Sequence, residues 1–146
     1  MRPVLPLAIP LVFALTGGVA PARSADSVTP GYWEAREEVL SPIHSLKVER
    51  RCITPQQVSR FMGCYINHHY QCTCPEQSAH DGVVVFKGHC VDNKGRRVGV
   101  EGRGTYTPTT LRMDAHVAFR LLGIPLSGEA TTDAHRLGDV CPPGAR

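Results

Sequence analysis

Apolar and polar residues alternate along much of the second half of the chain with the two-residue period of a β-strand. The alternation is strongest over residues 111–121, where apolar side chains occupy the odd positions and most even positions are charged. Residues 126–136 repeat the pattern after residues 122–125, which predict a turn. The two segments therefore predict an antiparallel hairpin that sets Phe119 opposite Gly128.

Shorter runs of strand-like composition precede this hairpin and are separated by turn-forming residues. They cover residues 31–40, 46–50, 66–74, 81–90 and 98–106. One helix is predicted between Thr54 and Gly63, because Thr54 and Gln57 match a capping box and Pro55 suits the first helical position. A helix this short must dock on the sheet, since two turns are not stable alone in water.

The pattern indicates a mostly β fold, a curved antiparallel sheet built as a meander or as a partly closed barrel-like structure, with one short α-helix. The sequence has no strand–helix alternation and no internal repeat. The expected core combines the apolar positions of residues 111–121 with side chains from other strands, namely Trp33, Val83, Val85, Val98 and Val100.

The first 25 residues have the features of a signal peptide, which leaves residues 26–146 as a single β-rich domain. An apolar run over residues 4–19 is followed by Ala-Pro-Ala, so cleavage is expected after residue 22, 24 or 25. The run has 16 residues and two prolines, whereas a spanning helix needs about 20 apolar residues. We therefore expect export to the periplasm and no stable membrane span.

The small net charge of the expected mature chain argues against nucleic acid as a partner. Removal of Arg2 and Arg23 with the leader leaves 14 of the 16 Lys and Arg residues against 13 Asp and Glu residues. The remaining basic residues form no stripe or cluster, so the sequence predicts no binding of nucleic acid.

All six cysteines lie in the expected mature chain, and an even number in a small exported domain favours disulfides. Cys52 follows an early strand and Cys141 ends the last one, so we expect these two to pair. The preferred pairing of the others joins Cys74 to Cys90 and Cys64 to Cys72. Exchanging Cys72 and Cys74 between these two bonds is the alternative.

The segment CYINHHYQCTC, residues 64–74, also carries two adjacent histidines and suggests a metal site as an alternative. In an extended strand His68, Cys72 and Cys74 share one face, and with His80 and His89 they offer ligands for zinc or cuprous copper. Cys-x-x-Cys spacing is absent, which argues against a thioredoxin-type redox site and against covalent haem attachment.

Catalytic motifs are missing from the sequence, which contains no Gly-x-Ser-x-Gly, no His-Glu-x-x-His and no phosphate-binding loop. Asp114 and Asp133 are expected to face each other across the last hairpin, where two carboxylates can share a proton. Arg112 and Arg120 are expected on the same polar face, where they can offset this charge. The sequence therefore predicts no catalytic residue and no cofactor.

Four short motifs then suggest a relationship: PGYWE at residues 30–34, RRCITPQQ at residues 50–57, a cysteine pair around a central hairpin, and HRLGDVC at residues 135–141. Over nearly all of residues 29–142 the chain resembles a family of small exported bacterial proteins of unknown function. Members of that family begin with Pro-Gly-x-Trp-Glu and end with Arg-Leu-Gly followed closely by cysteine. Two residues, Asp139 and Val140, separate Gly138 from Cys141 here, where one is usual.

The resemblance implies a periplasmic setting and a β-rich fold, and it implies no activity. Cys64 and one of Cys72 and Cys74 are additional to the family pattern. Taken together, the sequence predicts a non-catalytic binding or interaction module held by disulfides. Its expected partner is an apolar small molecule in the concavity of the sheet, or another envelope protein.

Overall fold

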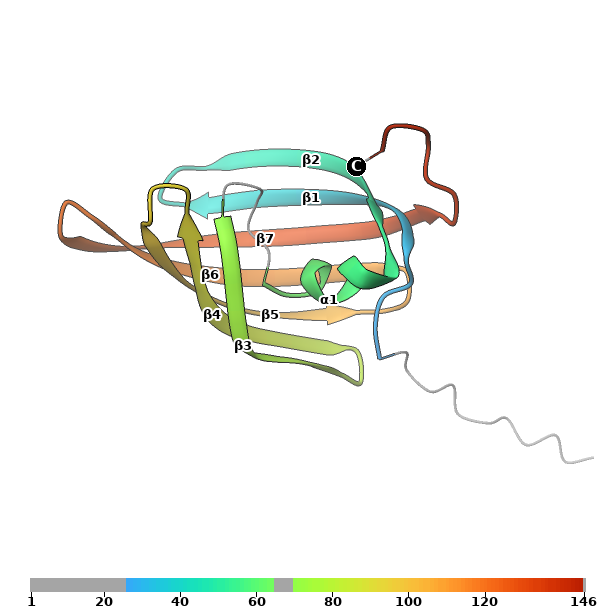
Figure 1. The fold of residues 1–146 in the computed structure, drawn as a ribbon, viewed down its shortest axis with the longest axis horizontal. Coiled ribbons are helices and arrows are strands. Elements are labelled where there is room, and N and C mark those ends of the chain that lie inside the picture. Colours follow the sequence, from blue (N-terminus) through green and yellow to red (C-terminus); the bar gives the residue numbers. More distant parts are fainter. Residues whose placement is uncertain (1–25, 65–69, 146) are drawn as a thin grey trace, which may run out of the picture.

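The computed structural model describes residues 26–64 and 70–145, which form a seven-stranded antiparallel sheet and one short helix (Figure 1). The strands are β1 (Gly31–Ser41), β2 (Ser45–Ile53), β3 (Tyr70–His80), β4 (Val83–Asp92), β5 (Arg97–Tyr106), β6 (Thr110–Leu121) and β7 (Ile124–Gly138). Their order is β2-β1-β7-β6-β5-β4-β3. Strands β3 to β7 form a meander, and β7 returns beside β1. The sheet is not closed, because β2 and β3 remain its two edges.

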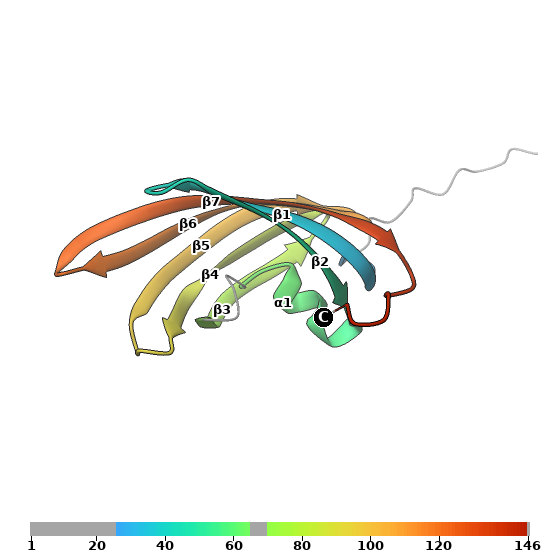
Figure 2. The ribbon, with the colours of Figure 1, turned by 90° about the horizontal axis from the view of Figure 1, so that it is seen from above.

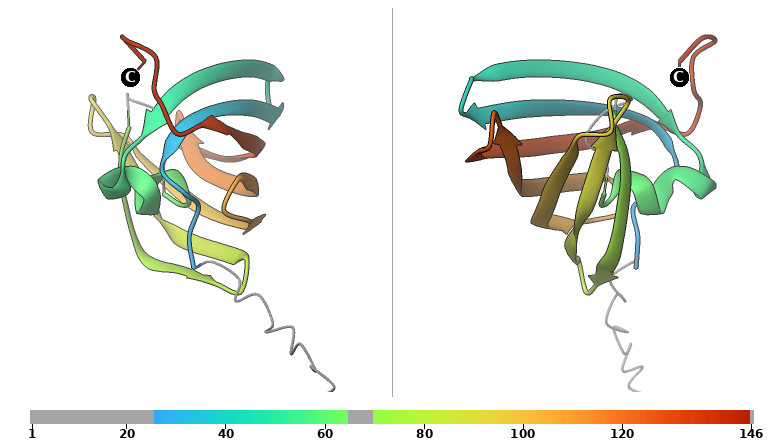
Figure 3. Two further views of the ribbon diagram at one scale, coloured as in Figure 1. Left: turned by 90° about the vertical axis from the view of Figure 1, so that its right-hand side faces the viewer. Right: turned by 60° about the vertical axis from the view of Figure 1, so that its left-hand side comes forward.

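The sheet is strongly curved, and the helix lies beneath the arch on its inner side (Figure 2; Figure 3). A 3-10 turn, Pro55–Gln57, leads into α1 (Val58–Phe61), within the residues predicted to be helical. The Thr54 amide donates to Gln57 Oε1 at 2.9 Å, which is half of the predicted capping box. The fold class expected from the sequence is therefore confirmed, with a curved open sheet rather than a closed one.

The core lies between α1 and the inner face of the sheet. Trp33 is fully buried, and its ring meets the ring of Phe61 at a centroid distance of 5.2 Å and an angle of 62°. Such edge-to-face pairs add about 0.5–1.5 kcal/mol beyond the burial of their area. The amide of the buried Val28 donates to the sulfur of Met62 at 3.4 Å. These contacts supply the docking that so short a helix needs.

The β6–β7 register differs from the prediction by two residues. Leu122 and Gly123 alone make the turn, with φ angles of 51° and 83°, so Ile124 pairs with Leu121 and belongs to the strand. Phe119 consequently lies opposite Leu126, not Gly128. The faces are unchanged, because a shift of two residues in a strand keeps every side chain on its side.

The buried face of β4 is the opposite of the one predicted. Val83 and Val85 are each 38 % exposed, whereas Val84 and Phe86 are 0 % and 5 % exposed. In a run of valines the alternation cannot distinguish the two faces. The pairing of β4 with β5 decides it, because it sets Val84 opposite Gly104 and Cys90 opposite Val98, which places Val84 on the same face as the buried Val98. The other core predictions from this region, Val98 and Val100, are buried.

Candidate functional site

The cysteine-rich segment is cross-linked in the structure. Cys52 is joined to Cys141, the pair expected from the sequence, and this bond ties the end of β2 to the segment after β7. Within residues 64–90 the bonds are Cys72–Cys90 and Cys64–Cys74, so the preferred pairing was wrong and the exchanged alternative is the one present.

The register of β3 explains the exchange. Cys72 lies directly opposite Cys90, with Cα atoms 4.0 Å apart. The register then shifts between Thr73 and Glu76, so Cys74 has no such partner on β4 and bonds Cys64 instead. A strand irregularity of this kind has no reliable signal in the sequence.

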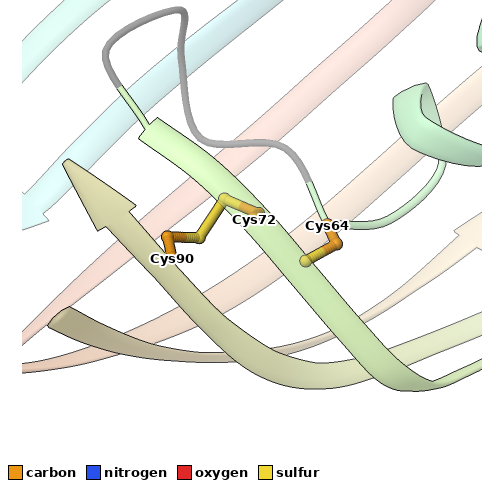
Figure 4. A group of neighbouring side chains, drawn as sticks. All are labelled: Cys64, Cys72 and Cys90. Atoms are coloured by element: carbon orange, nitrogen blue, oxygen red, sulfur yellow. A yellow bond between two sulfur atoms is a disulfide. The ribbon is translucent and has the colours of Figure 1, made fainter. Parts of the chain in front are cut away.

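The predicted metal ligands are not brought together. The sulfurs of Cys64, Cys72 and Cys90 lie within 4.8 Å of one another (Figure 4), but each belongs to a disulfide. His80 pairs with Val83 at one end of β4, and His89 pairs with Thr73 near the other. The two β4 positions, Val83 and His89, are six residue steps apart along the strand, roughly 20 Å. His68 lies outside the described residues.

The inner face of the sheet divides into two parts. Near α1 it is closed, with Trp33, Leu111 and Val84 at most 2 % exposed. Farther along the strands it is partly open and still apolar. We call this part the inner apolar strip; it comprises Val39, Ala115, Val117, Phe119, Leu126 and Ala130.

Strand pairing joins the members of the inner apolar strip across three neighbouring strands. Val39 of β1 lies opposite Ala130 of β7, which lies opposite Ala115 of β6. Farther along the same face, Phe119 of β6 lies opposite Leu126 of β7. Val39 and Leu126 are each 37 % exposed, so the strip offers accessible apolar surface on a concave wall.

A charged cluster borders this strip on the inner face of β1 and β2. Arg51 donates through Nη2 to Glu37 Oε1 at 2.5 Å and to Glu49 Oε2 at 3.0 Å. Lys47 forms an ion pair with Glu49 and remains 56 % exposed. The Arg51 side chain is only 14 % exposed. The inner face therefore has an apolar part, the inner apolar strip, bordered by charged side chains. Lys47 is the most exposed of these charged side chains.

The outer face carries a hollow of about 870 Å³ that is lined by charged side chains together with apolar ones such as Leu40 and Val85. Among its lining residues are Glu76, Lys87, Glu101, Arg103, Asp114 and His116. Lys87 Nζ lies 3.8 Å from Glu101 Oε2, and both side chains are more than half exposed. Both signs of charge are mixed and in contact with water, which is typical of the polar face of a sheet.

The predicted carboxylate pair does not form, because of the same two-residue shift in register. Asp133 lies opposite Arg112, whose Nη1 is 3.6 Å from Asp133 Oδ1. Asp114 lies opposite Thr131 on one side and Arg103 on the other. The two aspartates are thus separated, and the expectation that they share a proton is wrong.

Two turns are held by carboxylates that sequence reasoning did not single out. Asp92, whose side chain is 4 % exposed, accepts hydrogen bonds from the amides of Lys94 and Arg96 and from Arg96 Nε. Burial alone would raise the pKa of Asp92, but these hydrogen bonds outweigh it and lower the pKa below its usual value. The Asp-Asn-Lys-Gly sequence is the signal that such a turn was present.

Glu38 plays a similar part beside the β1–β2 turn. His44 Nε2 lies 2.8 Å from Glu38 Oε1, and this hydrogen bond is the main reason why the pKa of Glu38 is lowered. Both carboxylates therefore shape turns at the same end of the sheet.

Within the described ranges no helix is long and apolar enough to cross a membrane. A family model described as "Protein of unknown function (DUF3617)" matches residues 28–141. No curated protein and no solved structure matches the chain.

Proposed function

The chain belongs to this family of unknown function, so its function has to be inferred from its own structure. We propose that it is a non-catalytic binding module for an apolar small molecule. The observation that carries the proposal is the inner apolar strip, which is concave, accessible and left uncovered by α1. Val39 and Leu126, each 37 % exposed, mark its open edge. Ligand sites are typically concave and mostly apolar, with a few polar groups at the margin.

The shape of the strip indicates the class of ligand. Its apolar residues follow a path across β1, β7 and β6, which suits an extended hydrocarbon chain better than a compact ring system. Lys47 lies beyond the strip on the same face of the sheet, two residues before Glu49 on β2, and is accessible to an anionic head group. A fatty acid has both features, and we take it as the representative ligand.

The setting we propose is the periplasm, after removal of a leader that ends at residue 22, 24 or 25. Three disulfides support an oxidising compartment. The intact mass of protein exported from its own leader tests this directly. The denatured, unreduced chain should weigh about six units less than its reduced form, and the same spectrum locates the cleavage.

Binding is tested with cis-parinaric acid, a fluorescent fatty acid, on the oxidised protein. Val39→Asp and Leu126→Asp place a carboxylate on the inner apolar strip, and each should weaken binding by about tenfold or more. Val85→Asp is the matched control, since Val85 is 38 % exposed but lies on the outer face. Absence of saturable binding, or an equal loss in the control, would refute the proposal.

A metal-binding function is the second candidate, favoured by the three sulfurs that lie within 4.8 Å of one another. It requires reduction of both disulfides in the 64–90 segment, which would free Cys64, Cys72, Cys74 and Cys90 as thiolate ligands for zinc or cuprous copper. A native mass spectrum with a metal adduct and fewer than three disulfides would favour this function. A bare spectrum with three disulfides would exclude it. The other partner expected from the sequence, an envelope protein, stays a prediction.

A further inference from the structure

Three turns lie at the same end of the strands, with the β6–β7 turn between the other two (Figure 2). They connect β1 to β2, β4 to β5 and β6 to β7. We call this region the turn end and define it as residues 39–47, 91–97 and 119–126. It is the end opposite to Cys141 and the Asp81–Gly82 turn.

The β6–β7 hairpin extends beyond its neighbours at the turn end. The β5–β6 ladder stops at Ala118, and the β1–β7 ladder stops at Glu129. Residues 119–127 therefore pair only with each other. From residue 127 to the turn at residue 122 the ribbon reaches roughly 15–20 Å at the usual rise of a strand. A two-stranded ribbon is marginally stable in water, so this one gains from contact with a partner.

The tip of this ribbon is apolar. Leu121, Leu122 and Ile124 are 53 %, 94 % and 61 % exposed. On the β1–β2 turn, Leu40 and Ile43 add side chains that are 45 % and 78 % exposed.

Exposed aliphatic side chains gather at this end. Of the thirteen exposed large hydrophobic residues in the described ranges, eight belong to the turn end: Val39, Leu40, Ile43, Leu46, Leu121, Leu122, Ile124 and Leu126. Such a concentration at a single end marks an interaction surface, whereas scattered exposed aliphatics do not.

The turn end also carries cations. The turn end carries five cationic residues, namely Lys47, Lys94, Arg96, Arg97 and Arg120. Its one carboxylate among the described residues is that of Asp92, which is almost fully buried and bonded to Arg96. Glu38, just outside the turn end, is bonded to His44 and Arg36. Lys47 is paired with Glu49, which also lies just outside the turn end. The accessible positive charge here therefore comes from Lys94, Arg97 and Arg120.

We propose that the turn end docks on the surface of an anionic lipid bilayer. Leu121, Leu122 and Ile124 at the tip of the ribbon enter the head-group region, and the cations of the β4–β5 turn face the lipid phosphates. Amphipathic peripheral proteins bury their apolar face about 5–10 Å into this boundary, a depth that the projecting ribbon reaches without contact by the rest of the sheet. Each cation near such a surface adds attraction.

A second copy of the chain is a poorer occupant of the same surface. A two-fold contact would bring the cationic patches of the two copies together, because both copies contribute the same surface to such an interface. The positive charge that attracts anionic lipid thus opposes self-association.

The test is co-flotation of the full oxidised protein with vesicles of phosphatidylcholine, with and without phosphatidylglycerol. The protein should float with the anionic vesicles and remain behind with the neutral ones. The Leu122→Ser/Ile124→Ser variant should lower the partition coefficient by about tenfold or more. The Lys94→Gln/Arg97→Gln variant should lower it by roughly fivefold for each lost cation, and high salt should have the same effect.

Matched controls come from outside the turn end. Val140 is 83 % exposed near the C-terminal disulfide, so Val140→Ser removes an equally accessible aliphatic group. Lys87→Gln removes a cation from the outer face. Neither should change flotation. Absence of flotation with anionic vesicles overturns the proposal, as does an equal loss in the controls or a dimer that Leu122→Ser abolishes. The Leu122→Ser/Ile124→Ser variant should still bind cis-parinaric acid, because the inner apolar strip is unchanged. This measurement separates a failure of lipid docking from a failure of the function proposed above.

Discussion

Loop length should decide how much each of two disulfides stabilises the protein. Cys52–Cys141 spans a sequence separation of 89, and Cys64–Cys74 a separation of 10. All four cysteines are half-buried, so Ser replacements leave comparable local defects. In the chain-entropy model the cost of losing a cross-link is about 4.6 kcal/mol for a loop of roughly 90 residues and about 2.7 kcal/mol for one of roughly 11.

The comparison therefore uses two double variants, Cys52→Ser/Cys141→Ser and Cys64→Ser/Cys74→Ser, each oxidised so that its other two disulfides are formed. Equilibrium unfolding in urea should show the first to be less stable than the second by about 2 kcal/mol. The first should also show the steeper dependence on urea, because its denatured chain exposes more surface. Equal losses, or a larger loss for the short loop, would refute the loop-length argument.

Three further changes test separate contacts. Gly104→Ala should destabilise the protein by about 1–3 kcal/mol in thermal or urea unfolding, since its Cβ would lie 2.2 Å from the carbonyl oxygen of Arg112. Gly99→Ala in the same strand, whose nearest contact would be an ordinary 3.7 Å, should be nearly neutral, and similar losses for both would contradict the steric explanation. The pKa of Asp92 is lowered in the folded protein, so the stability that its charge adds is complete above its unfolded pKa of about 3.9 and is lost as the pH falls through the lower folded value. The advantage of wild type over Asp92→Asn in urea unfolding should therefore shrink on acidification, and an advantage independent of pH would refute this role. The hydroxyl of Tyr106 is buried without a hydrogen-bond partner among the described residues. Tyr106→Phe should thus leave the melting temperature unchanged or raise the stability by up to about 1 kcal/mol, and a clear destabilisation would reveal a bonded hydroxyl.

Several features follow from local sequence alone. The alternation of residues 111–121 defines a strand with one apolar face, and Leu111 and Met113 are buried accordingly. Thr54, Pro55 and Gln57 mark the start of the helix, because capping depends on residues within one turn. The even number of cysteines predicted disulfides, and the positions of Cys52 and Cys141 at the ends of early and late strands predicted their bond.

Tertiary structure decided what depends on register and on strand order. A run of valines has two equivalent faces, so only the pairing of β4 with β5 determines that Val84, and not Val83 or Val85, is buried. The irregularity after Thr73 selects Cys72 as the partner of Cys90, which alternation along one strand cannot reveal. The turn end is also a product of topology, because Ile43, Lys94 and Leu122 are far apart in sequence and come to the same end of the sheet only through the order of the strands. Local preferences act over a few residues, whereas these features depend on how distant strands pair.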